Sequence, residues 1–281
     1  MKYIVFLCLL ILMSCKEENA IPFDFDVKEN EMPTVILSIP CNADEGFVDL
    51  RFGADTGADI NTFYNNTELK VFGSQENIEK LIAKSGITVD FEKGETVNFG
   101  ILNIKCANII FPDLLIKQTS KGDKTILDGV LGYNAFKDYG IVIFDFRKKK
   151  IVLGEKKVHK NVLPLKIKNF KTAVSNSNLL MIPVEIDGKM NDVILDTGFS
   201  SLGEPMILTS PATKMPKSFS VKIGSVLYKN VKLDTTMDGF YCNLTSENAE
   251  NFFKDILLMG NAFFQNHRIQ LDFENMTFAM D

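Results

Sequence analysis

The segment Asp55-Thr56-Gly57-Ala58-Asp59 recurs 141 residues later as Asp196-Thr197-Gly198-Phe199-Ser200. In both places the preceding sequence has the pattern of a strand, a hairpin turn and a second strand, at residues 34–54 and at residues 179–195. The two segments therefore belong to a repeated unit. Each is expected to form an abrupt loop directly after the second strand of its unit.

The two units match again further along the chain. Val130-Leu131-Gly132 precedes Asn134-Ala135-Phe136, just as Leu258-Met259-Gly260 precedes Asn261-Ala262-Phe263. Each unit then ends with an apolar strand that carries an aspartate, Asp145 in the first and Asp272 in the second. These two aspartates lie inside apolar strands away from the loops, so we interpret them as structural or surface carboxylates. From Asn134 onward the offset is 127 residues, so the first unit is longer in its middle.

Most of the chain alternates like strand, and we expect a mostly β protein. A helix is predicted at residues 74–86, and short helices are predicted just after Gly132 and Gly260. A length of 281 residues suits two domains at about 150 residues each. The expected domains are residues 32–154 and 178–281, joined by a basic linker at residues 155–177.

Composition excludes several functions. Hydrophobic residues make up 46% and charged residues 24%, which is the balance of a globular protein with a sizeable core. Lys and Arg number 31 against 36 Asp and Glu, which argues against a dedicated nucleic-acid binder. His159 and His267 are the only histidines and no Cys-x-x-Cys occurs, so no metal site is expected. Whether Cys41 and Cys106 form a disulfide stays open, with Cys242 as the odd cysteine.

Ten Lys and Arg residues lie between Arg147 and Lys171, where the one acidic residue is Glu155. Such a run is typical of a solvated turn and linker. The alternative is a patch that touches anionic lipid or glycan.

Residues 1–14 have the pattern of an export signal, because their apolar run is too short to span a membrane. Leu12-Met13-Ser14-Cys15 resembles the lipobox of bacterial lipoproteins, which implies cleavage before Cys15 and lipid attachment to it; an ordinary signal peptide is the alternative. Lys16-Glu17-Glu18 resembles the acidic signals of lipoproteins sent to the outer face. We therefore expect an outer membrane lipoprotein of the bacterial cell envelope, exposed at the surface, with residues 15–31 as a lipid-anchored tether.

The repeated arrangement at residues 33–281 resembles the retropepsin-like and pepsin-like aspartic proteases, in the form of a single chain that holds both halves. The resemblance implies a bilobal fold with two similar β-barrel lobes related by pseudo-two-fold symmetry. It implies an aspartic endopeptidase with Asp55 and Asp196 as its catalytic dyad. It also implies a peptide or protein substrate, a monomer, and no cofactor or metal ion.

Two carboxylates suit this chemistry because peptide hydrolysis without a metal needs both a base and an acid. Held close together, the two like charges cannot both form cheaply, so the pair shares one proton. The resemblance assigns support of the dyad to hydroxyls that hydrogen-bond across the interface and to glycines that allow close approach. These residues are Thr56, Gly57, Thr197, Gly198, Gly132 and Gly260.

The sequence departs from the family pattern at several places. Phe199 stands where the family usually has Ala, Ser or Thr, and Gly53 and Ala54 are smaller than the usual apolar pair. Neither Phe91 to Ile104 nor Pro211 to Lys222 has the pattern of a clear Gly-rich flap hairpin.

Two other functions compete with the protease. One is a catalytically inactive lipoprotein that binds a peptide or glycan on the same scaffold. The other is a calcium-binding surface domain, because Asp55 and Asp59 flank a glycine; no Asp-x-Asn-x-Asp-Gly loop accompanies them.

Overall fold

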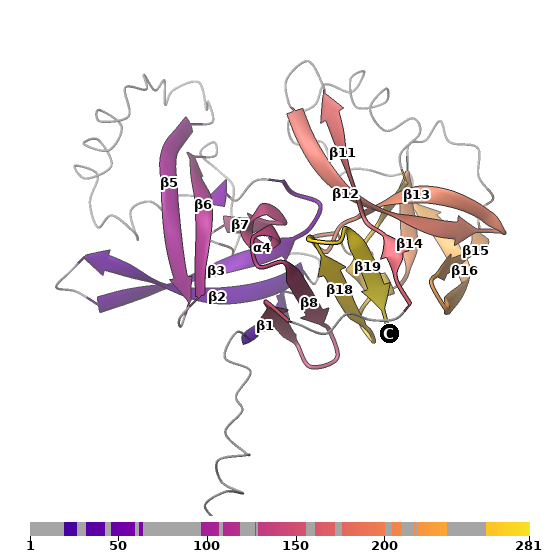
Figure 1. Cartoon of the computed structure of the whole chain (residues 1–281), viewed down its shortest axis with the longest axis horizontal. Helices are drawn as coiled ribbons and strands as arrows, with labels where there is room; N and C mark the ends of the chain where they lie inside the picture. The colour runs from indigo at the N-terminus through magenta and orange to yellow at the C-terminus, as the bar shows by residue number, and fades with distance from the viewer. Residues whose placement is uncertain are drawn as a thin grey trace, which may run out of the picture.

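The protein is mostly β, as predicted (Figure 1). Among the described residues, two short helices occur at the places predicted after Gly132 and Gly260: α4 (Asn134–Lys137) and the 3-10 helix η3 (Asn261–Phe263). The computed structural model describes residues 20–26, 32–42, 46–59, 62–63, 97–106, 109–118, 127, 129–155, 161–171, 176–199, 204–209, 216, 218–234 and 257–281.

Several predictions fall outside these residues. The helix predicted at residues 74–86 and Cys15, the predicted lipidation site, lie outside them, as do the side chains of Cys41 and Cys106. The two flap candidates lie only partly inside. In the described part of the chain, no helix is long and apolar enough to cross a membrane.

The larger sheet contains ten strands. In spatial order they are β10 (Leu163–Pro164), β19 (Thr277–Met280), β18 (Arg268–Asp272), β8 (Ile141–Asp145), β9 (Lys150–Leu153), β1 (Ala20–Asp26), β2 (Met32–Asn42), β3 (Gly46–Asp55), β7 (Gly129–Gly132) and β4 (Thr62–Phe63). A separate hairpin, β5 (Val97–Cys106) with β6 (Ile109–Gln118), lies against β2 and β4. The first unit is therefore a half-barrel.

The second unit contains a sheet of seven strands that closes on itself. In spatial order they are β11 (Lys166–Lys171), β12 (Asn176–Ile186), β13 (Lys189–Leu195), β17 (Leu257–Met259), β14 (Met206–Thr209), β16 (Val226–Asp234) and β15 (Ser218–Ile223). Because β15 also pairs with β12, the six strands from β12 to β15 form a closed barrel. β11 continues the sheet outside it.

Four strands occur in the same order in both sheets, β2-β3-β7-β4 in the first and β12-β13-β17-β14 in the second. In each set the second strand is antiparallel to the first and parallel to the third. The register also agrees, since Ala54 pairs with Leu131 and Leu195 pairs with Met259. In each unit, the residue before the Asp-Thr-Gly loop therefore pairs with the residue before Gly132 or Gly260. The repeated sequence thus forms the same four-strand arrangement twice.

The closing strands of the two units, β8 and β18, pair directly and antiparallel. Ile143 pairs with Gln270, and these two residues are 127 apart in sequence (270 − 143). The offset between the two units is also 127 residues at this point, so each β8–β18 pair corresponds to a pair of the same ladder when the two units are interchanged. The core is continuous across this junction, where the rings of Phe146 and Phe264 lie 6.0 Å apart.

The predicted tether at residues 15–31 is wrong for residues 20–26, which form β1. This strand pairs with β2 on one side and β9 on the other. Ile21 and Phe23 are buried, whereas Pro22 and Asp24 are exposed. The segment therefore has the period-two alternation of a half-buried strand.

The predicted linker at residues 155–177 is also wrong for much of its length. It contains β10, which pairs with β19, and β11, which pairs with β12. Lys166 and Lys168 are exposed, as a solvated run requires, but Leu165 between the two strands is buried. The lysines follow strands rather than an irregular linker.

The position of β1 predicts that Ile21 contributes strongly to stability. Ile21→Ala should lower the free energy of unfolding by about 2–5 kcal/mol, because it removes a fully buried side chain. The measurement is denaturant unfolding, with Asp24→Ala as the control. Asp24 lies on the same strand but is exposed, so its loss should change stability little. Equal stability of the Ile21→Ala variant and the wild type would contradict the place of β1 in the sheet.

Candidate active site

The two predicted catalytic aspartates come from corresponding strand ends. Asp55 is the last residue of β3, and Asp196 directly follows β13. After each aspartate the chain turns at once, with Ala58 N–H donating to the Asp55 carbonyl and Phe199 N–H to the Asp196 carbonyl. Both loops therefore leave their sheets at the same point, and the structure brings them together.

The two threonines join the loops by reciprocal hydrogen bonds. Thr56 N–H donates to Thr197 Oγ1 and Thr197 N–H donates to Thr56 Oγ1, each at 3.0 Å. Each hydroxyl then donates across the interface to a carbonyl, Thr56 to Leu195 at 2.9 Å and Thr197 to Ala54 at 2.7 Å. Both side chains are fully buried, so losing one partner would leave a buried polar group unsatisfied.

The glycines make room for the opposite carboxylates. A Cβ atom on Gly57 would lie 2.6 Å from Asp196 Oδ2, and one on Gly198 would lie 2.7 Å from Asp55 Oδ2. Real Cβ atoms are not found at such distances. Each carboxylate therefore occupies the space that a side chain on the other loop would need.

Backbone N–H groups hold both carboxylates in place. Asp55 Oδ1 accepts a hydrogen bond from Gly57 N–H at 2.8 Å. Asp196 Oδ1 accepts one from Gly198 N–H at 2.8 Å and another from Phe199 N–H at 2.9 Å. These bonds orient the carboxylates before any substrate binds.

Burial raises the pKa values of both carboxylates of the pair. Burial raises the pKa of Asp196 well above its usual value, and the charge of Asp55 raises it further. Burial also raises the pKa of Asp55, although hydrogen bonds from Asp196 and from backbone N–H groups oppose this rise. Asp196 is buried, whereas Asp55 is partly exposed. Two carboxylates that affect each other in this way are expected to titrate as a pair.

The residues at and directly after Gly132 and Gly260 contact the two Asp-Thr-Gly loops. Tyr133 N–H donates to the Ala58 carbonyl at 2.9 Å, and Asn261 N–H donates to the Phe199 carbonyl at 2.8 Å. A Cβ on Gly260 would collide with the Phe199 carbonyl and lie 2.7 Å from its ring carbon Cδ1. Gly132 pairs with Asp55 in the β3–β7 ladder. The unusual Phe199 thus packs against Gly260.

Two asparagines belong to the site but have no role in the sequence prediction. Asn134 Nδ2 donates to the Asp59 carbonyl, and Asn261 Nδ2 donates to the Thr197 carbonyl at 3.4 Å. Both occupy the first position of the repeated Asn-Ala-Phe. Their recurrence at the same place in both units could have identified them as site residues, although the contacts themselves depend on the folded loops.

Asp145 and Asp272 are the last residues of β8 and β18, directly before the turns that follow these strands. Asp145 Oδ1 accepts a hydrogen bond from Lys148 N–H at 3.0 Å, and Asp272 Oδ1 accepts one from Asn275 N–H at 2.8 Å. Both carboxylates are buried and hold the backbone of their turns. Their contacts agree with the structural role that we expected.

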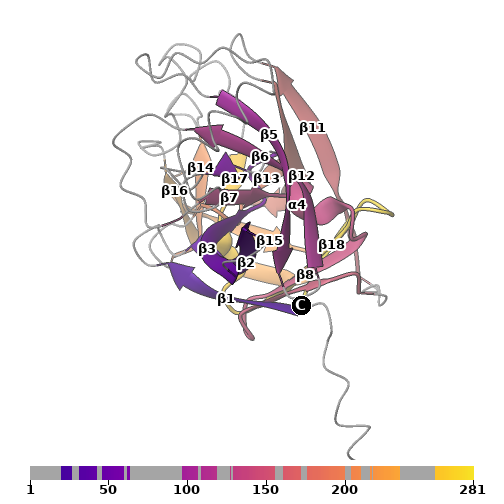
Figure 2. The ribbon, with the colours of Figure 1, turned by 90° about the vertical axis from the view of Figure 1, so that its left-hand side faces the viewer.

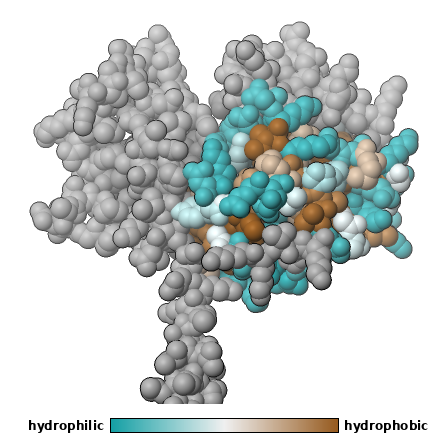
Figure 3. Space-filling view, in the orientation of Figure 1, coloured by the Kyte–Doolittle hydropathy of each residue, from teal (hydrophilic) through white to brown (hydrophobic). Residues whose placement is uncertain are grey.

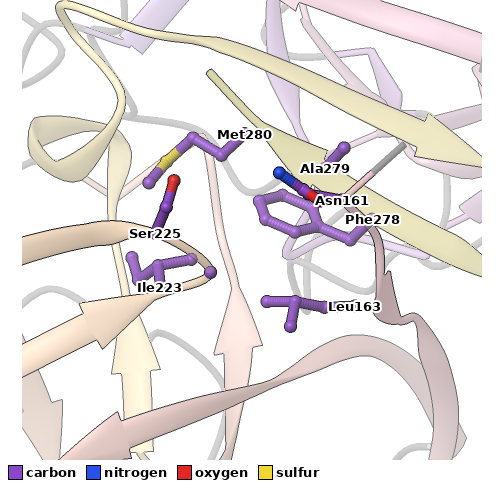
Figure 4. Close-up of a pocket in the computed structure, with 8 residues that line it drawn as sticks. Asn161, Leu163, Ile223, Ser225, Phe278, Ala279 and Met280 are labelled. Atoms are coloured by element: carbon purple, nitrogen blue, oxygen red, sulfur yellow. The ribbon is translucent and has the colours of Figure 1, made fainter. Parts of the chain in front are cut away.

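Other features offer little chemistry. Within the described ranges, no group of three or more His, Cys, Asp or Glu side chains could hold a metal ion. A small pocket lies between the β15–β16 turn and strands β10 and β19, where Phe278 and Met280 face Ile223 and Ser225 (Figure 4). No ionisable group lines it, so it does not suit catalysis. On the face in Figure 3, the described surface alternates between hydrophilic and hydrophobic residues.

Taken together, the two loops present a partly exposed carboxylate, Asp55, beside a buried one, Asp196. Such a pair can accept a proton at one oxygen and donate one at another. No protein-family model matches the chain, and no curated protein matches it.

The crossed glycine contacts predict a specific pattern of coupling. Gly198→Ala and Gly57→Ala should each lower the free energy of unfolding by about 1–3 kcal/mol, because the added methyl group displaces a held carboxylate. In an Asp55→Ala background, Gly198→Ala should lower the free energy of unfolding much less, because the Asp55 carboxylate that the new methyl group would meet is absent. Gly57→Ala should keep its full cost in that background, since its obstacle is Asp196.

Denaturant unfolding of the single and double variants measures this coupling. Additive effects of Asp55→Ala and Gly198→Ala would contradict the crossed arrangement. Equal coupling of both glycines to Asp55 would contradict it as well.

Proposed function

We propose that this chain is an aspartic endopeptidase that hydrolyses peptide bonds with Asp55 and Asp196 as its dyad. The observation that carries the proposal is the crossed packing of each carboxylate against the glycine of the other loop. This packing leaves two carboxylates side by side in a site where their pKa values are raised. The buried carboxylate of Asp145 differs from this pair, because the guanidinium of Arg147 lies 4.0 Å from its Oδ1.

The fold that we propose is the bilobal arrangement of retropepsin-like and pepsin-like proteases, with two similar lobes related by pseudo-two-fold symmetry. Support comes from the strand order shared by β2-β3-β7-β4 and β12-β13-β17-β14. Further support comes from the self-matching register of β8 with β18. The lobes differ in closure, because β12 pairs with β15 whereas the described β2 and β5 only lie in contact.

In the proposed reaction, the ionised carboxylate takes a proton from a water molecule, and the oxygen of that water attacks the carbonyl carbon of the peptide. The protonated carboxyl gives its proton to the carbonyl oxygen, which yields a neutral tetrahedral intermediate. The carboxyl that took the proton from water then gives it to the amide nitrogen, and the C–N bond breaks. A hydroxyl proton of the intermediate passes to the other carboxylate as the carboxylic acid product forms, so the pair again holds one proton. Asp55, which is the more exposed of the two, is the carboxylate better placed to meet water.

The proposed location is the bacterial cell envelope, with the lipid anchor at Cys15. Because β1 begins at Ala20, only residues 16–19 separate Cys15 from the first strand. Five Cα-to-Cα steps span at most about 17 Å. The body of the enzyme would therefore stay close to the membrane surface, and its peptide or protein substrates would have to reach it there.

Replacement of either aspartate tests the function directly. Asp55→Asn and Asp196→Asn should each lower kcat on a peptide library by at least about 10²–10⁴-fold, because each removes one half of the acid-base pair. Asp192→Asn is the matched control, since Asp192 is an exposed carboxylate on β13 that pairs with Lys166. Its activity should remain that of the wild type.

Two results would overturn the proposal. Cleavage that persists in both dyad variants would remove the assigned roles of Asp55 and Asp196. Tight peptide binding by the wild type without cleavage at acid or neutral pH would instead support an inactive binding lipoprotein.

A further inference from the structure

We propose that Asp59 is a positioning residue that fixes the β11–β12 hairpin of the second unit against the first active-site loop, and so sets where substrate lies relative to the dyad. This inference rests on the proposed function. It concerns a carboxylate that the dyad chemistry does not use.

The contact itself joins residues 119 apart in the sequence. Asn178 N–H, on β12, donates to Asp59 Oδ2 at 2.6 Å in a partly buried setting. In the second loop the corresponding position is Ser200, so the sequence does not offer the same carboxylate on the other side.

Asp59 is itself held firmly from the first unit. Its carbonyl accepts a hydrogen bond from Asn134 Nδ2, at the start of α4. The neighbouring Ala58 carbonyl accepts one from Tyr133 N–H. Burial, with a smaller contribution from the charge of Asp59, raises the pKa of Tyr133 to about 12. The loop thus offers a fixed acceptor to the hairpin.

The β11–β12 hairpin of the second unit is longer than the corresponding β1–β2 pairing of the first unit. Thr34 and Met181 hold the same place in the two units, because their partners Gly53 and Ile194 each lie two residues before an aspartate. From that place to its end, the described β1–β2 ladder has three pairs and the β11–β12 ladder has six. Figures 1 and 2 show β11 and β12 extending together as a ribbon beyond the barrel.

The β11 strand of this extension has little support from apolar packing, because the side chains of Lys166, Ile167, Lys168 and Asn169 are all exposed. On β12, Leu179 and Leu180 are buried, so apolar packing holds the end of the hairpin nearest the barrel. Beyond Leu179 the described pairings are those of a two-stranded ribbon, which is only marginally stable in water. Its contact with Asp59, four residues after Asp55, therefore fixes both the ribbon and its position beside the dyad.

The main test is the steady-state kinetics of Asp59→Ala on a peptide that the wild type cleaves. KM should rise by roughly 10-fold while kcat stays within about threefold, because the dyad is intact but the wall beside it has moved. The pH profile of kcat should not shift. Asp59→Asn keeps an oxygen acceptor for Asn178 N–H, so it should restore a KM near that of the wild type.

Two further variants sharpen the test. Asn178→Pro removes the donor from the hairpin side, and combining it with Asp59→Ala should raise KM no further than either change alone. Asp187→Ala is the matched control, since Asp187 Oδ1 accepts a hydrogen bond from Ser220 N–H at 2.8 Å elsewhere in the barrel. Its KM should not change.

Amide hydrogen exchange gives a readout that does not depend on cleavage. Amides of residues 166–171 should exchange at least about tenfold faster in Asp59→Ala than in the wild type, with no change at residues 268–272. If the wild type cleaves no peptide, the proposed function fails, and the exchange data still decide whether Asp59 holds the hairpin.

Three outcomes would overturn the inference. Unchanged exchange at residues 166–171 in Asp59→Ala would show that the contact does not hold the hairpin. An Asp59→Asn variant as impaired as Asp59→Ala would show that the charge, and not the acceptor, is needed. A fall in kcat with a shifted pH profile would make Asp59 part of the acid-base machinery.

Discussion

The reciprocal hydrogen bonds between Thr56 and Thr197 are the interaction on which the rest of the site depends. Each buried threonine bonds only to groups of the other unit, through its N–H and its hydroxyl. Separating the units would therefore leave several buried polar groups without partners in one step. The carboxylates, the glycines and the backbone amides around them keep their geometry because this junction holds the loops at a fixed separation.

Placing two carboxylates there opposes folding, and other parts of the molecule offset the cost. Both pKa values are raised above the ordinary value, so the folded pair binds protons more tightly than the unfolded chain. The stabilisation that this proton binding provides is complete below the ordinary aspartate pKa and is lost as the pH rises through the raised values. The β8–β18 ladder and the continuous apolar core supply stability that does not depend on pH in this way.

The sequence was sufficient to predict the parts of the fold that repeat. The Asp-Thr-Gly loops, the strands before them and the glycines behind them could be found because both copies keep the same residue types at corresponding places. β1 and β11 were missed because polar residues, Asp24 and Lys168 among them, occupy their exposed positions and resemble irregular chain. Neither the contact of Asp59 with Asn178 nor the barrel closure by β12 and β15 could be predicted, because each depends on how distant segments meet.

The central claim is that Asp55 and Asp196 form one titrating pair, and carbon-13 NMR of labelled aspartate carboxyl groups tests it most directly. The account predicts that one resonance of the pair titrates well above the ordinary aspartate pKa of about 3.9 and that both resonances sense each step. In Asp55→Asn, the remaining Asp196 should titrate at lower pH than in the wild type, because the repelling charge is gone. Two independent titrations near the ordinary value, unaffected by the replacement, would contradict the account.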